Sequence, residues 1–173
     1  MSADTDTVDI APVDGIDQYE QAVLKALPVD AVHVADSEAE HYDAVLEDTL
    51  VASRGVRLFG MITTDTGTPV DLKTCQRWIT DRHAHNGRRR GRWKFDSEAH
   101  EALAADDGGY LLAVLEDGEV VAWAIVHPDD MLDFLGWTPN GDGEYRDRSA
   151  QLRWAAVFPP EWLDRDDQGG DQP

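Results

Sequence analysis

The alternation of apolar and polar residues predicts a central strand at residues 69–75, PVDLKTC. Val70 and Leu72 fall on one face of such a strand and Asp71 and Lys73 on the other, because successive side chains of a strand point to opposite faces. The pattern therefore predicts a carboxylate and an ammonium side by side on one strand face.

The strongest further signal is a pair of apolar runs at residues 110–115 and 120–126, separated by the turn sequence Glu-Asp-Gly-Glu. Runs of this kind are typical of a hairpin of buried strands. Similar reasoning about periodicity, caps and turns predicts helices at 17–27, 37–53, 96–103 and from Pro128 onward, and strands at 29–35, 56–63, 91–95 and 151–154. Residues 64–67 are predicted to form the hairpin turn that joins 56–63 to the central strand.

A length of 173 residues suits one domain. Residues 1–15 are acidic and show no periodicity, so we expect a disordered acidic lead, then a single α/β domain over 16–163 and a polar tail over 164–173. The sequence has no apolar run of membrane-spanning length and no basic-then-apolar signal peptide, and its one cysteine forms no internal disulfide. We therefore expect a cytoplasmic protein.

The overall charge is strongly acidic, with a formal net charge of -20. Asp outnumbers Glu by 25 to 10 and Arg outnumbers Lys by 12 to 3, a composition that resembles the proteins of extremely halophilic archaea. Molar salt screens long-range repulsion, so this acidity does not exclude a nucleic-acid partner.

A basic island interrupts this acidity directly after the central strand. Seven of the fifteen basic residues lie within eighteen positions: Arg77, Arg82, Arg88, Arg89, Arg90, Arg92 and Lys94. We interpret the island as a basic loop that binds the DNA backbone, because clustered arginines in an acidic protein favour a phosphate-binding role. A solvated loop that balances acidic neighbours is the simpler interpretation. Trp78 and Trp93, which flank the island's arginines, stack on bases or pack in the core.

The predicted element order is α-β-β-β-α-β, with Asp71-Leu72-Lys73 on the second strand of a hairpin and a basic loop behind it. This arrangement resembles the core of the PD-(D/E)XK nuclease superfamily, which includes restriction endonucleases and archaeal Holliday-junction resolvases. The three-residue motif matches the family's (D/E)-x-K. The resemblance implies a restriction-endonuclease-like mixed sheet with helices on both faces.

The resemblance also implies a chemistry. Asp71 would be a ligand of Mg²⁺ or Mn²⁺, the backbone carbonyl of Leu72 would complete the metal site, and Lys73 would orient the attacking water or stabilise negative charge. Gln76 would reach the scissile phosphate. The implied function is that of a metal-dependent nuclease hydrolysing DNA phosphodiester bonds.

The sequence departs from the family at the first acid, which normally lies on the preceding strand. Residues 56–63 contain no Asp or Glu. Asp65 in the turn is one candidate for the second ligand, and the acids of the predicted helix at 37–53 are others, namely Glu40, Asp43 and Glu47.

Three alternatives stay open at this point. Asp71 and Lys73 can form an exposed ion pair worth under about 1 kcal/mol. A domain of the same fold that lacks the first acid can bind DNA or a protein without cutting it. A third interpretation is an interaction module in which the apolar hairpin at 110–126 forms a homodimer edge. The sequence contains no P-loop, GxGxxG, GxSxG or HExxH pattern and no recognisable histidine spacing for a metal.

Overall fold

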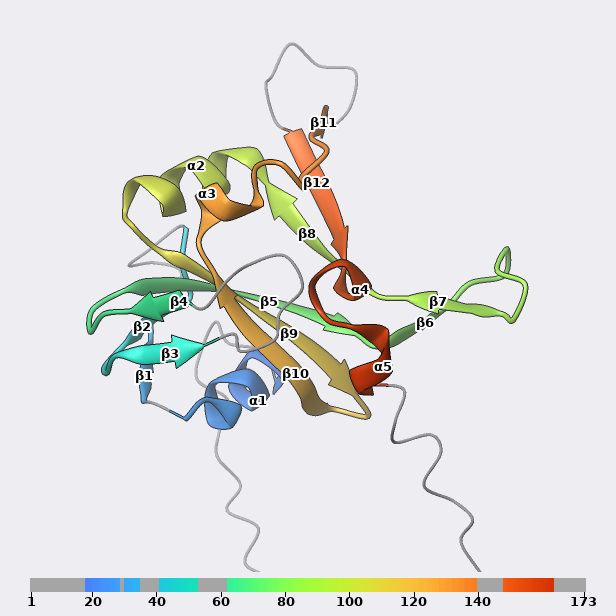
Figure 1. Cartoon of the computed structure of the whole chain (residues 1–173), viewed down its shortest axis with the longest axis horizontal. Coiled ribbons are helices and arrows are strands. Elements are labelled where there is room, and N and C mark those ends of the chain that lie inside the picture. The colour runs from blue at the N-terminus through green and yellow to red at the C-terminus, as the bar shows by residue number, and fades with distance from the viewer. Residues whose placement is uncertain (1–17, 29, 35–40, 53–61, 140–147, 164–173) are drawn as a thin grey trace, which may run out of the picture.

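A computed structural model describes residues 18–28, 30–34, 41–52, 62–139 and 148–163. Its centre is a five-stranded mixed sheet in the order β1-β2-β5-β9-β10 (Figure 1). These strands are β1 (Ala31–His33), β2 (Ala44–Leu46), β5 (Pro69–Gln76), β9 (Gly109–Glu116) and β10 (Glu119–Val126). Strands β5 and β9 run parallel, and the other three neighbouring pairs are antiparallel. The expected α/β class with a mixed sheet is confirmed.

Helices cover both faces of this sheet, as expected. On one face, Leu72 of β5 and Leu111 of β9 form an apolar cluster with Val23 of α1 (Gln18–Ala26). On the other face, Tyr110 of β9 shares a cluster with Leu103 of α2 (Ser97–Ala105). Strand β9 is buried along nearly its whole length because neighbouring side chains pack on opposite faces.

Two local signals in the sequence form as predicted. The Asp96 carboxylate accepts hydrogen bonds from the amides of Glu98 and Ala99 at 3.0 and 3.3 Å, which caps α2 at its first turn. Asp117 and Gly118 both have positive φ angles, 52° and 86°, as a tight two-residue turn between β9 and β10 requires. The predicted hairpin is therefore confirmed.

A second, three-stranded sheet of order β11-β12-β8 lies over the face that carries α2. It consists of β8 (Arg92–Asp96), β11 (Thr138–Pro139) and β12 (Arg148–Arg153), and it is accompanied by the short helices α3 (Pro128–Met131), α4 (Trp154–Val157) and α5 (Pro160–Leu163). Two tryptophan side chains of this layer form hydrogen bonds to the main sheet and the residue that follows β5. Trp93 Nε1 donates to the carbonyl of Ala113 at 3.0 Å, and Trp154 Nε1 donates to the carbonyl of Arg77 at 2.8 Å.

The predicted basic loop is instead a two-stranded arm. Strand β6 (Trp78–Thr80) continues directly from the end of β5, and β7 (Arg88–Arg90) returns antiparallel to it. Figure 1 shows the arm projecting away from the body. At its base, Gly91 crosses so close to β5 that a Cβ atom there would lie 1.9 Å from the carbonyl oxygen of Gln76.

The predicted helix at 37–53 is wrong. Residues 44–46 are β2, and β3 (Leu50–Ala52) pairs with β4 (Ile62–Thr64), while 35–40 and 53–61 lie outside the described residues. A three-residue strand fits a helical stripe as well as an alternating one, so the pairing of β2 with β1 and β5 decides its conformation.

The predicted pairing of 56–63 with the central strand is wrong as well, because β4 pairs with β3. The Asp-Leu-Lys motif thus lies on the third strand of the main sheet, between β2 and β9. The expected lead and tail fall largely outside the described residues and stay predictions. In the described part of the chain, no helix is long and apolar enough to cross a membrane.

Candidate active site

Strand β5 brings Asp71 and Lys73 together on the face that carries the second sheet. The Lys73 ammonium lies 2.6 Å from Asp71 Oδ1, and the two side chains are 28% and 6% exposed, respectively. The pair is therefore partly buried, unlike the exposed ion pair considered from the sequence alone.

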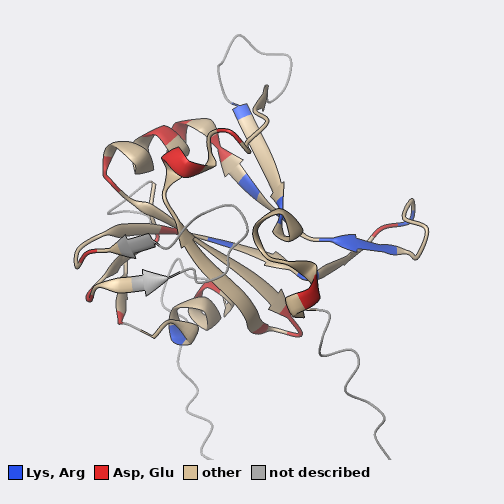
Figure 2. Cartoon of the chain, viewed as in Figure 1, with Lys and Arg blue, Asp and Glu red and all other residues tan. Residues whose placement is uncertain are grey.

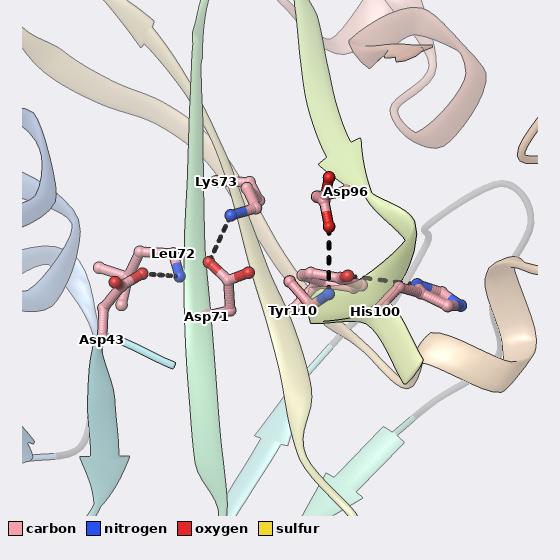
Figure 3. Close-up of polar contacts among 8 residues, drawn as sticks. Asp43, Asp71, Leu72, Lys73, Asp96, His100 and Tyr110 are labelled. Carbon is pink, nitrogen blue, oxygen red and sulfur yellow. Dashed lines mark hydrogen bonds and ion pairs between the residues drawn. The ribbon is translucent and has the colours of Figure 1, made fainter. Parts of the chain in front are cut away.

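A second carboxylate, that of Asp43, lies beside this pair. Asp43 directly precedes β2, and its Oδ2 accepts a hydrogen bond from the backbone amide of Leu72 at 2.7 Å. Figure 3 shows its side chain reaching β5 at Leu72, next to Asp71 and Lys73. The acid that the sequence analysis lacked on residues 56–63 is thus present on the neighbouring strand of the sheet.

The fold makes ionisation of Asp71 unfavourable. Burial raises the pKa of Asp71 to about 7, against the opposing charge and hydrogen bond of Lys73. Asp43 adds to the rise in this pKa through charge repulsion and a side-chain hydrogen bond, so the two carboxyl groups interact directly. Strongly shifted pKa values cluster at functional sites, so this environment marks Asp71 as a candidate site residue.

The donor atoms fit a hard divalent cation. Two carboxylates meet here, and the Leu72 carbonyl points to the same edge of β5 as its amide, which is the edge that faces Asp43. The pairing of β2 with β5 extends only as far as Val70, so Leu72 lies beyond the paired residues. Oxygen ligands of this kind suit Mg²⁺ or Mn²⁺. Among the described residues, no group of three or more His, Cys, Asp or Glu side chains is placed to hold a metal ion.

Tyr110 forms the buried wall next to Asp71. The two residues are register partners on the parallel strands β9 and β5, and Tyr110 is fully buried. Its hydroxyl lies 3.2 Å from His100 Nδ1, and burial, together with the charges of Asp71 and Asp96, raises the pKa of Tyr110. Figure 3 shows Tyr110 between Asp71 and His100, which belongs to α2. The Tyr110 phenol therefore stays neutral, and its ring shields one side of Asp71 from water.

Most of the predicted basic residues do gather on one surface. Figure 2 shows the arm as the main basic segment, while acidic residues mark α2, α3 and the turns. Arg82 is exposed at the tip of the arm, and the others lie on two strands: Arg88, Arg89 and Arg90 on β7, and Arg92 and Lys94 on β8.

Arg77 does not belong to this surface. It is 3% exposed, and its Nη1 donates to both carboxylate oxygens of Glu116 at 2.9 and 2.7 Å. A buried guanidinium that is engaged in this way holds the end of β5 to β9.

The structure does not bring the remaining predicted residues to the acid pair. Asp65 is exposed in the turn before β5, where its carbonyl accepts a hydrogen bond from the Thr68 hydroxyl. The alternation of β5 places Gln76 with Leu72, on the face opposite Lys73. Glu40 lies outside the described residues.

Cys75 and Trp93 are buried in the core. Burial raises the pKa of the Cys75 thiol to about 12, which disfavours the thiolate form. Trp93 is 1% exposed and packs in the core, whereas Trp78 is partly exposed on the arm.

The residue that sequence reasoning undervalued is Asp43. It appeared only as one of several acids on a predicted helix, although it directly precedes the apolar triplet Ala-Val-Leu of residues 44–46. Interpreting that triplet as a short buried strand would have placed an acid at its start, 28 positions before Asp71.

Comparison with known proteins identifies a family. The model of a PD-(D/E)XK nuclease superfamily domain matches residues 14–159, which is most of the chain. No curated protein and no solved structure matches the chain.

Proposed function

We propose that this chain, which belongs to the PD-(D/E)XK nuclease superfamily, hydrolyses DNA phosphodiester bonds in a metal-dependent reaction at Asp43, Asp71 and Lys73. The observation that carries the proposal is the second carboxylate. Asp43 reaches β5 from the adjacent strand and interacts with Asp71, so the motif on β5 has the acidic partner that the chemistry requires.

Each residue of the centre has a distinct role. Asp43, Asp71 and the Leu72 carbonyl would hold a divalent ion, which when bound polarises the phosphate and acidifies water. Lys73 provides a fixed ammonium on the same strand face, where it holds the attacking water and stabilises the negative charge that develops on the phosphate. Tyr110 and the second sheet limit the access of bulk water from behind.

The basic surface would hold the substrate. It consists of the arm residues Arg82, Arg88, Arg89 and Arg90 with the β8 residues Arg92 and Lys94. Arg89 is paired with Asp81 at 3.1 Å, so its charge is partly balanced within the arm. The other residues offer guanidinium and ammonium donors to backbone phosphates. Contacts of this kind bind a duplex without regard to its sequence.

Incubation of the protein with supercoiled plasmid in Mg²⁺ or Mn²⁺ tests the proposal. The wild type should nick or linearise the plasmid, and Asp71→Asn and Lys73→Met should each reduce the rate at least about 100-fold. The first removes a proposed metal ligand, and the second removes the ammonium that stabilises charge on the reacting phosphate. Lys25→Met, which removes an exposed lysine on α1, is the matched control and should leave the rate unchanged.

Two results would count against catalysis. Cleavage that persists in Asp71→Asn would point to a contaminating nuclease or another centre. DNA binding without cleavage by the wild type would support the non-catalytic alternative of the same fold.

A further inference from the structure

A cavity of about 670 Å³ opens at the base of the arm, between the arm and the second sheet. Its basic wall includes Arg88, Arg90, Arg92 and Arg153, and its apolar wall includes Trp78 and Ala156 of α4. The volume lies within the range of pockets that bind small organic ligands. The lining therefore offers an aromatic surface and several guanidinium groups to one ligand.

Planar groups already stack along the apolar wall. The Arg88 guanidinium lies 4.5 Å from the centre of the Trp78 ring, and Arg90 lies 5.6 Å from that ring and 5.4 Å from the ring of Trp154. Unpaired bases stack on aromatic rings and on guanidinium planes in the same manner. A base can therefore extend this stack, with Arg88 or Trp78 as its platform.

Two arginines at the cavity each have one donor atom without an acceptor. The Nε atoms of Arg90 and Arg92 are buried and have no hydrogen-bond partner among the described residues. The acid that lines the cavity, Asp81, is engaged by Arg89. A buried guanidinium donor without an acceptor is costly, and phosphate oxygens are acceptors that match it.

We infer that this cavity binds one unpaired nucleotide of the DNA, with its base on the Trp78–Arg88 stack and its phosphate on Arg90, Arg92 and Arg153. The inference rests on the proposed function and names its substrate class, which is DNA with a single-stranded end or junction. A base inside a duplex must first be unpaired and unstacked to enter a cavity of this kind, which costs free energy, whereas a single-stranded base enters without that cost.

The cavity is within reach of the proposed centre along one strand of DNA. Trp78 follows Lys73 by five positions, so their Cα atoms lie at most about 18 Å apart. This distance is short enough for one strand of DNA to span both.

Fluorescence anisotropy with the full-length Asp71→Asn protein in EDTA tests the inference without cleavage. The probes are a labelled blunt 20-base-pair duplex and the same duplex with a three-nucleotide single-stranded extension, each competed with thymidine 5′-monophosphate. We expect the extended duplex to bind at least about tenfold more tightly than the blunt one, since stacking of one base contributes this much.

Two added substitutions localise the preference. Trp78→Ala should abolish the tenfold difference, and Trp78→Phe should keep it. Arg153→Gln changes an exposed side chain on β12, so its folding is secure, and it should weaken binding of the extended duplex only. Melting temperatures of all variants establish that they are folded.

Three outcomes would overturn the inference: equal affinity of the parent for both duplexes, a preference that survives both Trp78→Ala and Arg153→Gln, or competition by the free mononucleotide at the concentration of the extended duplex. The last would assign the cavity to free nucleotides. Because no metal or cleavage is involved, these results are separate from a failure of the nuclease activity itself.

Discussion

At the residue scale, the proposed centre contains a carboxyl group, that of Asp71, whose ionised form the fold disfavours. Asp71 is 4% exposed, and burial raises its pKa to about 7. The folded protein therefore holds this proton more tightly than the unfolded chain does. The associated stability is fully present below the unfolded value of 3.8 and is lost as the pH rises through about 7. A cation that binds the ionised form would restore it.

Asp71→Asn should therefore stabilise the metal-free protein at pH 8, by on the order of 2 kcal/mol, and the advantage should fade toward pH 4. Denaturant unfolding of both proteins in EDTA across this pH range measures the effect. Asp65→Asn, at an exposed carboxylate in the turn before β5, is the control and should stay within about 0.5 kcal/mol of the wild type. A difference between Asp71→Asn and the wild type that does not vary with pH would contradict the assigned environment.

At the element scale, β5 links the proposed centre to the arm. One continuous stretch carries Asp71 and Lys73, ends at Gln76 and leads into β6, and the returning chain crosses it at Gly91. Gly91 lies against the backbone of Gln76 and joins β7 of the arm to β8. This one contact therefore affects both the direction of the arm and the position of β8 over the main sheet.

Gly91→Ala should destabilise the protein by about 2 to 3 kcal/mol, because a methyl group would lie 1.9 Å from a backbone oxygen that cannot move without shifting β5. Gly136→Ala is the matched control, since a Cβ atom there meets nothing within 4 Å. Thermal unfolding of the two variants gives the comparison. Equal melting temperatures would mean that the crossing at Gly91 is not this close.

The sequence predicted the elements that neighbouring residues specify and missed β2, for physical reasons. The hairpin at 110–126 and the cap at Asp96 are specified by neighbouring residues, so they were predictable. Strand β2 has three residues and is defined by partners distant in sequence, so no local pattern distinguishes it from a helix. Asp71 and Lys73 were recognisable from alternation, whereas Asp43 gained its place only through that long-range pairing.

At the scale of the whole molecule, the charge is divided between an acidic body and a basic arm (Figure 2). A formal net charge of -20 repels DNA at low salt, so the proposed DNA binding requires contacts close to the arm. This organisation allows a member of the PD-(D/E)XK nuclease superfamily to combine an acidic surface with a nucleic-acid substrate.

The double substitution Arg88→Gln with Arg90→Gln should therefore weaken DNA binding by at least about tenfold. It should also reduce the magnitude of the slope of log K, where K is the DNA-binding constant, against log salt concentration by about one to two, because one to two phosphate contacts are lost. Lys25→Gln with Arg148→Gln removes the same charge from α1 and from the start of β12, away from the cavity. Titrations at several KCl concentrations compare the two. Equal losses in both double variants would show that net charge, rather than the arm, governs binding.

The most direct test of the central claim is the plasmid-cleavage rate of Asp43→Asn beside that of Asp65→Asn in Mg²⁺. The geometry predicts a loss of at least about 100-fold for Asp43→Asn and a rate near that of the wild type for Asp65→Asn, because only Asp43 reaches β5 next to Asp71. Full activity of Asp43→Asn, or loss of activity in Asp65→Asn alone, would contradict the assignment of Asp43 as the partner of Asp71.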